Sequence, residues 1–224
     1  IAIAADPARF GSPDDFALAD AVEVFNQRSA WDAEGATSRY LRGMLFGTDY
    51  FLRVLDQRPA DNLAAYDRLA RAAHVTLLAG IGDAENMTVM GAKVGSFQQL
   101  FLFYTTHVLA TERANDPIID ALRHGHAYVS FDFLGYVPQF AFYAESGGTK
   151  TMLGDEASLA ASLSLKAELP EIADRVVLLQ DGAEVASVEN ASTLEFAPKS
   201  AGAYRIEAYR SGAPWILSNP VYVR

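Results

Sequence analysis

Three short apolar runs in this chain each end at a polar cluster, and this arrangement limits the fold more than any other feature. The runs are residues 1–5, 21–25 and 75–82, and the polar residues that follow them are Asp6, Asn26 and the segment Asp83–Asn86. Segments with a helical pattern separate the runs, so the order of elements predicts a parallel sheet or barrel, an α/β fold. In such folds the chemistry lies at the C-terminal ends of the strands. The sequence therefore predicts a site rich in oxygen ligands at that edge.

Composition narrows the classes of partner. A chain of 224 residues can form one large domain or two small ones. Half of the residues are apolar, so a well-buried core is expected. The net charge of −10 argues against nucleic acid or an anionic membrane as a partner, and fits a hard cation or a small-molecule substrate better. The absence of cysteine excludes disulfides, zinc–thiolate sites and cysteine nucleophiles. Exported and cytosolic chains can both lack cysteine, so the compartment stays open.

In the first half of the chain, the segments between the apolar runs have a mainly helical pattern. The stretch Gln27–Gln57 is expected to be mostly helical, and a second helix is expected over Pro59–His74 with Leu63, Tyr66 and Leu69 on its buried face. The segment Asn86–Gln99 has no clear period and is expected to form a long loop over the site. A short helix is predicted from Asp116 to Gly125.

The second half of the chain has the alternation of β-strands. Residues 128–133 and 139–145 alternate and are rich in aromatic side chains, and Asp181-Gly182 stands between two alternating runs, which is a strong hairpin signal. Six or seven short strands in about 70 residues indicate a small Ig-like β-sandwich. We therefore expect two domains, residues 1–156 and residues 157–224.

Several motifs, taken in order, resemble a known family. They are a strand that ends before Pro7, the strand Val-Glu-Val-Phe-Asn, a strand that ends Gly-Ile-Gly-Asp-Ala-Glu-Asn, the helix Ile-Ile-Asp-Ala-Leu-Arg-His-Gly-His-Ala-Tyr, and the tail Pro-Trp-Ile-Leu-Ser-Asn-Pro-Val-Tyr. This set resembles the later part of the PHP-domain (polymerase and histidinol phosphatase) metal-dependent hydrolases, in the subgroup with an appended β-domain. The resemblance implies part of a distorted, TIM-related β/α barrel that holds two or three divalent metals and hydrolyses phosphoesters.

The resemblance also implies a set of site residues, with departures from the family pattern. Asp83 matches a family ligand, whereas Asp6 and Glu85 each stand where the family has histidine. Carboxylates favour Mg²⁺, Mn²⁺ or Ca²⁺ over Zn²⁺, and the identity of the metal stays open among these four. His126 and His107 are the candidate proton donors.

Several alternatives remain open from the sequence. Glu23 faces either the site or the surface, and Asn26 either matches a family position or simply forms a turn. The chain is either a hydrolase with altered ligands or a catalytically inactive PHP-like binding or scaffold protein, and a third option is an exported carbohydrate-binding protein. Because the chain starts at Ile1 within a strand pattern, we expect its own N-terminal segment or a partner chain to complete the barrel.

Overall fold

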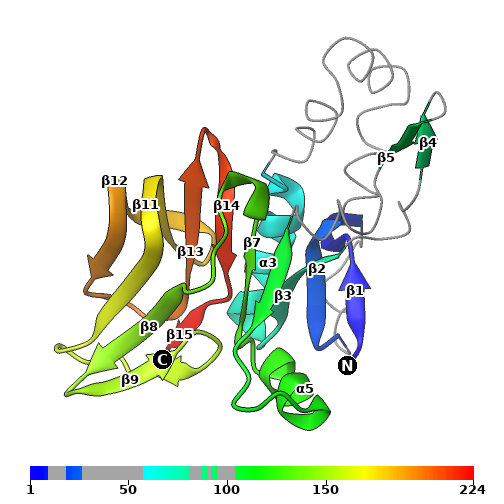
Figure 1. Ribbon diagram of the computed structural model, residues 1–224. Coiled ribbons are helices and arrows are strands. Elements are labelled where there is room, and N and C mark those ends of the chain that lie inside the picture. The colour runs from blue at the N-terminus through cyan, green and yellow to red at the C-terminus, as the bar shows by residue number, and fades with distance from the viewer. Residues whose placement is uncertain (10–18, 27–57, 81–86, 90–91, 95–103) are drawn as a thin grey trace.

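The protein is mostly β in structure. The computed structural model describes residues 1–9, 19–26, 58–80, 87–89, 92–94 and 104–224. This part of the chain contains fifteen strands but only two α-helices, α3 (Ala60–Ala72) and α5 (Asn115–Arg123). The predicted fold class, a partial TIM-related β/α barrel followed by a sandwich, is therefore wrong. Most of the described chain instead forms one curled antiparallel sheet, shaped like half of a barrel (Figure 1).

A small parallel sheet retains the strand–helix alternation that the sequence predicted. It contains β1 (Ile3–Ala5), β2 (Ala21–Asn26) and β3 (Thr76–Gly80), which pair in parallel in the order β1-β2-β3. Helix α3 lies between β2 and β3 in the chain and buries the apolar face that its period predicted. Parallel pairing and the α3 helix are thus confirmed, but the alternation ends at β3.

The large sheet contains ten strands, all but one pair of them antiparallel, and curls on itself at the left of Figure 1. Its strands are β6 (Thr105–Val108), β7 (Ala127–Ser130), β8 (Ala141–Ser146), β9 (Thr149–Met152), β10 (Glu156–Ala157), β11 (Ser164–Gln180), β12 (Ala183–Phe196), β13 (Gly202–Arg210), β14 (Ala213–Ser218) and β15 (Val221–Val223). The smaller elements are η1 (Pro7–Arg9), η4 (Asp132–Leu134) and the two-stranded β4 (Met87–Val89) and β5 (Ala92–Val94), so part of the segment expected to be a loop is a hairpin.

Strands from both sides of the predicted domain boundary share the large sheet. β8 precedes residue 157 and pairs with β11, and β7 pairs with β14. The sequence shows that these segments alternate, but alternation does not say which strand will be the neighbour. The aromatic segments near residues 128 and 141 therefore form β7 and β8 of an antiparallel sheet, with β7 between β6 and β14 and β8 between β11 and β9, and they are not barrel strands. The division at residue 157 stays a prediction.

A buried amide joins the parallel sheet to the large sheet. Asn219, between β14 and β15, is fully buried, and its Oδ1 accepts hydrogen bonds from the hydroxyl of Tyr66 (3.0 Å) and the N–H of Leu77 (2.6 Å). Its Nδ2 donates to the carbonyl oxygens of Leu77 (3.1 Å) and Ala127 (2.7 Å). One side chain thus connects α3, β3 and β7, and every polar atom of its amide group is paired.

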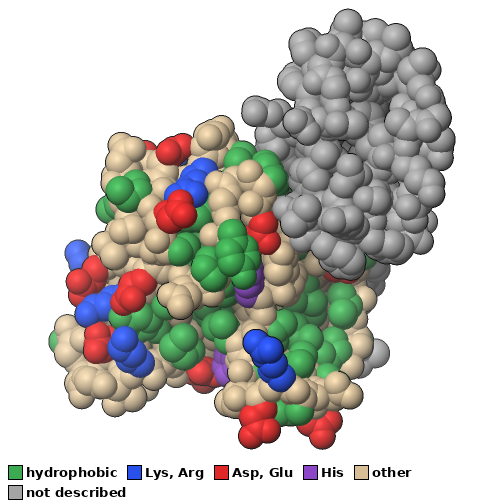
Figure 2. Space-filling view, viewed as in Figure 1, with side chains coloured by type: hydrophobic (Ala, Val, Ile, Leu, Met, Phe, Trp, Pro, Cys, Tyr) green, Lys and Arg blue, Asp and Glu red, His purple; other side chains and the backbone are tan. Residues whose placement is uncertain are grey.

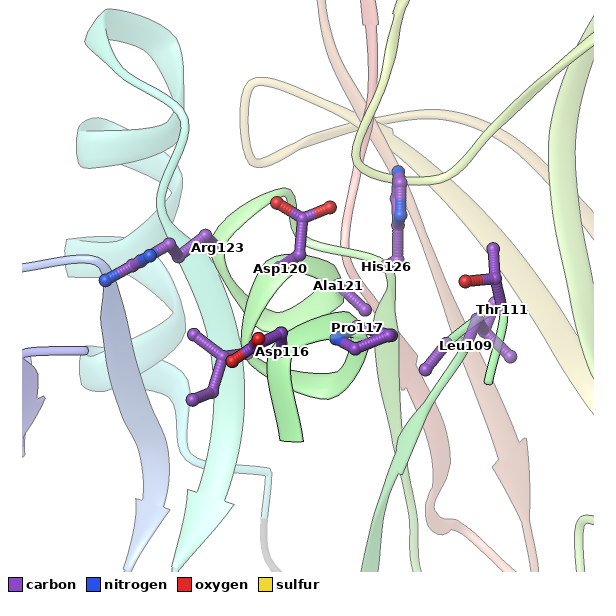
Figure 3. A pocket seen from close by; sticks show the side chains of 10 residues that line it. Leu109, Thr111, Asp116, Pro117, Asp120, Ala121, Arg123 and His126 are labelled. Atoms are coloured by element: carbon purple, nitrogen blue, oxygen red, sulfur yellow. The ribbon is translucent and has the colours of Figure 1, made fainter. Parts of the chain in front are cut away.

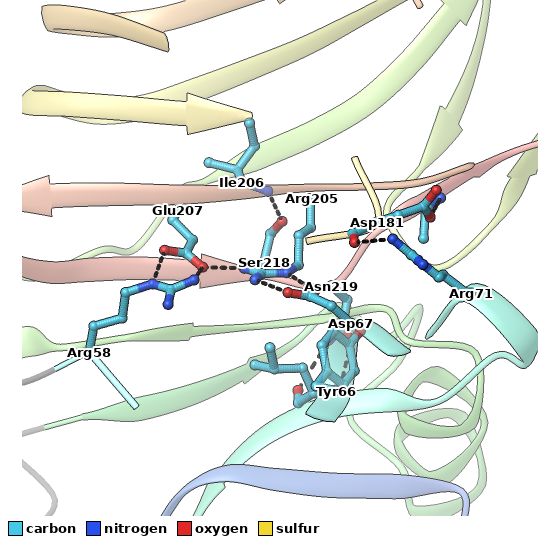
Figure 4. Close-up of polar contacts among 12 residues, drawn as sticks. Arg58, Tyr66, Asp67, Arg71, Asp181, Arg205, Ile206, Glu207, Ser218 and Asn219 are labelled. Carbon is cyan, nitrogen blue, oxygen red and sulfur yellow. Dashed lines mark hydrogen bonds and ion pairs between the residues drawn. The ribbon is translucent and has the colours of Figure 1, made fainter. Parts of the chain in front are cut away.

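A chain of buried charges joins α3 to β13. The Arg205 guanidinium binds both oxygens of Asp67 on α3, at 2.6 and 2.8 Å, and donates to Glu207 at 2.7 Å (Figure 4). Arg58 binds both oxygens of Glu207 at 2.7 Å. Arg205 and Glu207 are each 1% exposed, so these charges satisfy one another instead of being solvated.

Candidate functional site

The carboxyl edge of the parallel sheet carries the first predicted metal ligand, Asp6. Its N–H donates to the carbonyl oxygen of Glu23 at 3.3 Å, so the pairing of β1 with β2 continues one residue beyond β1. The φ angle of Asp6 is +52°, in the left-handed region, which aspartate tolerates better than most residues. The residue is 7% exposed, and Asn62 of α3 donates to one of its carboxylate oxygens at 3.3 Å. Arg9 lies 3.7 Å from the other oxygen. The fold therefore holds a buried carboxylate at the predicted edge.

A second carboxylate, that of Glu23, lies at the same edge between β2 and β3. Asn26 at the end of β2 donates to one of its oxygens at 2.8 Å. A Cβ added at Gly80, the last residue of β3, would lie 2.2 Å from Oε1 of Glu23, so the carboxylate rests against the bare backbone of Gly80. The hydroxyl of Tyr104 donates to the Gly80 carbonyl at 2.7 Å. Burial raises the pKa of Tyr104, and the nearby Glu23 charge raises it further, so the hydroxyl stays protonated as a donor.

These oxygens are of the chemical type that hard divalent cations prefer. Carboxylate and amide oxygens are ligands that Mg²⁺, Mn²⁺ and Ca²⁺ prefer. Asp6 carries such oxygens directly after β1, and Glu23 and Asn26 carry them on β2. Among the residues that the structure describes, no group of three or more His, Cys, Asp or Glu side chains is close enough to hold a metal. Asp83 and Glu85, the other two predicted ligands, lie outside the described residues.

The side chain of His107 points away from the parallel sheet. Thr106, its neighbour on β6, exchanges hydrogen bonds with the backbone of Ala79 on β3, at 3.2 and 3.3 Å. Successive side chains of a strand point to opposite faces, so His107 points away from β3. Its Nε2 lies 2.8 Å from the Oγ of Ser130, which in turn donates to Asp132 at 2.6 Å. The structure therefore does not bring His107 together with Asp6.

The hydrogen bonds around His107 define which ring nitrogen carries a proton. The hydroxyl protons of Ser130 and Thr105 are both donated to Asp132, at 2.6 and 2.5 Å. Ser130 has no second proton, so Nε2 of His107 must donate to it. The ring stacks on Tyr128 with centroids 4.4 Å apart. Burial lowers the pKa of His107, and the Asp132 charge partly opposes this shift. This network is a structural joint between β6, β7 and η4.

His126 lies near the opposite edge of the parallel sheet. It follows Gly125, where an added Cβ would lie 3.7 Å from the hydroxyl of Thr76, the first residue of β3. Asp6, in contrast, follows the last residue of β1. The Nε2 of His126 is 2.8 Å from a carboxylate oxygen of Asp155. The structure thus separates His126 from Asp6 by the length of the sheet.

An open depression of about 560 Å³ lies beside His126 and α5. Its charged lining residues are Asp116, Asp120, Arg123 and His126. Figure 3 shows that their charged ends point in different directions, and Figure 2 shows that acidic side chains at this end of the molecule face outward. These groups do not converge on one point.

The roles of Glu23 and Asn26 stayed open from the sequence, and neither Gly80 nor Tyr104 carried a signal that pointed to this site. For Glu23 and Asn26, the available signal was their place in the sequence: Asn26 directly follows the apolar run 21–25, and Glu23 lies within that run, three residues before Asn26. The contact between Glu23 and Gly80 depends on a register irregularity in β2 between Glu23 and Phe25, which has no signature in the sequence.

Comparison with models of protein families gives no match. Comparison with curated proteins gives none either. In the part of the chain that the structure describes, no helix is long and apolar enough to cross a membrane.

Proposed function

We propose that this protein is a metal-dependent hydrolase of the PHP type, with a hard divalent cation at the carboxyl edge of β1-β2-β3. The observation that carries the proposal is the pair of carboxylates at this edge: Asp6 after β1, and Glu23 held by Asn26 beside the end of β3. Asp83 and Glu85 follow Gly80 by three and five positions in the sequence.

The donor set supports this choice of chemistry. Every candidate ligand is an oxygen donor, which favours Mg²⁺ or Mn²⁺ over Zn²⁺. A bound cation of this kind supplies a nucleophilic hydroxide and polarises a phosphoryl oxygen. Asp6, Glu23, Asp83 and Glu85 would hold the cation, and the substrate class is a phosphate ester.

The residues next to the proposed ligands, Asn62 and Gly80, hold the ligand side chains in position and take no part in the chemistry. Asn62 donates to Asp6 and also to the carbonyl of Val24 at 3.0 Å, so it fixes the Asp6 carboxylate relative to β2. Gly80 leaves room for Glu23. Both contacts pre-organise oxygens at the edge, which lowers the cost of binding a cation.

Metal analysis of the purified chain tests the proposal. After incubation with Mn²⁺ and desalting, the protein should retain metal stoichiometrically, and Asp83→Ala and Asp6→Ala should each lose most of it. Asp61→Ala is the matched control, because Asp61 is exposed on α3. Hydrolysis of bis(p-nitrophenyl) phosphate should follow metal content across these variants.

Two results would contradict the proposal. The first is the absence of retained Mn²⁺, Mg²⁺, Ca²⁺ or Zn²⁺ in the wild-type chain, and the second is equal metal content in wild type and Asp83→Ala. Either result would favour the PHP-like binding or scaffold protein, which recognises a ligand without hydrolysing it.

A further inference from the structure

A groove lined by arginines lies along α3, on a different side of the helix from Asp6. It has a volume of about 360 Å³ and lies between the outer face of α3 and the turn that joins β11 to β12. Arg58, Arg68 and Arg71 line it, together with small residues of the helix and the turn. This concentration of positive charge stands out in a protein whose net charge is −10.

The carboxylates of Asp67 and Asp181 also line the groove, and both accept hydrogen bonds from the protein. Both oxygens of Asp67 bind Arg205, at 2.6 and 2.8 Å. The carboxylate of Asp181, in the turn, accepts the N–H of Ala203 at 2.9 Å. Asp67 is therefore neutralised by Arg205, whereas Asp181 keeps its negative charge and offsets one of the two positive charges of Arg68 and Arg71.

Arg68 and Arg71 retain donors for a ligand. Arg71 donates one hydrogen bond to the neutral carbonyl of Asp181, at 2.9 Å (Figure 4). Arg68 is exposed and has no hydrogen-bond or ion-pair partner among the residues that the structure describes. The two residues are three positions apart on α3, so they lie on one face, and like charges at this spacing repel each other. An anion between them would remove this repulsion.

The turn on the other side of the groove has a conformation that keeps it close to the helix. Asp181 and Gly182 have φ angles of +52° and +85°, as in the tight hairpin turns that favour this residue pair. A Cβ added at Gly182 would lie 2.9 Å from an oxygen of Asp67. The groove therefore has two fixed walls, one helical and one formed by the turn.

We propose that this groove binds a phosphate-type oxyanion, either free or carried by a small phosphomonoester. The guanidinium group matches phosphate oxygens with paired, charge-assisted hydrogen bonds, which distinguishes arginine from lysine at such sites. Arg68 and Arg71 supply the main donors. Arg58, at the other end of the groove, is paired with Glu207 through its Nε and Nη2 and adds little net charge.

The test is a titration followed by side-chain nitrogen NMR at constant ionic strength. Inorganic phosphate should shift the Nε–H resonances of Arg68 and Arg71, with a dissociation constant on the order of 1 mM. Arg68→Ala should weaken binding by about tenfold. Arg113→Ala is the matched control, because Arg113 is exposed, lies outside the groove and has no ion pair among the described residues.

Comparison of ligands and variants decides the outcome. Glycerol 3-phosphate binding more tightly than inorganic phosphate would identify the ligand as a phosphomonoester, and the reverse order would identify free phosphate. The proposal is overturned if chloride at equal ionic strength shifts the same resonances equally, or if Arg113→Ala weakens binding as much as Arg68→Ala. Arg68 has no partner to lose in the described structure, so the substitution should leave the melting temperature unchanged, which the same samples can verify.

Discussion

Replacement of the buried Glu207 by glutamine should destabilise the protein strongly at neutral pH. Arg205 and Arg58 each donate to its carboxylate at 2.7 Å, and the hydroxyl of Tyr209 donates to it as well. Although burial opposes ionisation, these donors lower the pKa of Glu207 from 4.5 to about 2. Glutamine has nearly the same shape but no charge, so it leaves the buried guanidinium of Arg205 and the half-buried one of Arg58 short of a counter-charge.

The size of the effect follows from the pKa shift. A drop from 4.5 to about 2 corresponds to about 3 kcal/mol of folding free energy. Because the folded-state pKa is lowered, this contribution is complete above pH 4.5 and disappears as the pH falls towards 2. Glu207→Gln should therefore lower the free energy of unfolding by about 3 to 5 kcal/mol at pH 7, within the range for breaking a buried ion pair. The difference from wild type should shrink below pH 4.5.

Urea denaturation, followed by the fluorescence of the buried Trp215, measures both the loss of unfolding free energy and its dependence on pH. Unfolding curves at pH 7, 5, 4 and 3 give the free-energy difference between variant and wild type at each pH. Glu189→Gln is the matched control, because that side chain is 64% exposed and pairs only at the surface with Arg175. Its effect should be below about 1 kcal/mol. A Glu207→Gln effect as small as the control, or one that does not change with pH, would refute the electrostatic reasoning.

Three further predictions concern other parts of the fold. Asn219→Ala leaves four buried partners unpaired and should lower the free energy of unfolding by about 3 to 5 kcal/mol in urea denaturation. Gly80→Ala places a methyl group 2.2 Å from the Glu23 carboxylate, so it should reduce Mn²⁺ retention with little loss of secondary structure by circular dichroism. Ile3→Lys places a charge on an edge strand where Ile3 is 52% exposed, so sedimentation should show less self-association than in wild type. An unchanged free energy of unfolding, unchanged Mn²⁺ retention or unchanged sedimentation would contradict the first, second or third prediction, respectively.

The elements predicted correctly from the sequence are those with local signals. The apolar period of α3 places Leu63, Tyr66 and Leu69 on one face, and the structure buries all three. Asp181-Gly182 is a two-residue turn between β11 and β12, as that residue pair indicates. Such features depend on residues within one turn of helix or one hairpin, so they are visible without knowledge of the rest of the chain.

Strand partners could not be predicted in the same way. β8 and β11 pair across a gap of about twenty residues in the chain, and β7 pairs with β14 across more than eighty. Alternation defines the two faces of each strand but not its neighbour or its direction. The resemblance to a β/α barrel supplied partners that the structure contradicts, and this led to the wrong fold class.

The candidate site shows the same division between local and long-range information. A carboxylate directly after a strand indicated Asp6, and the parallel pairing of β1 and β2 places it at the expected edge. His107 and His126 carried equally reasonable local signals, yet strand alternation turns one away from β3, and the antiparallel sheet places the other at the far edge. Histidine identity alone cannot decide this, because the direction of a side chain depends on the register of its strand.

The buried polar groups explain why the two sheets form one structure. Asn219, Arg205 and Glu207 come from the last fifth of the chain, and their partners Asp67 and Tyr66 lie on α3. Apolar packing between the sheets would tolerate small shifts, but a fully bonded amide and a bidentate guanidinium each accept only one relative position. These contacts therefore position α3 relative to both sheets. Because α3 also carries Asn62, which holds Asp6, a change at Asn219 or Arg205 should weaken cation binding at the carboxyl edge as well as stability.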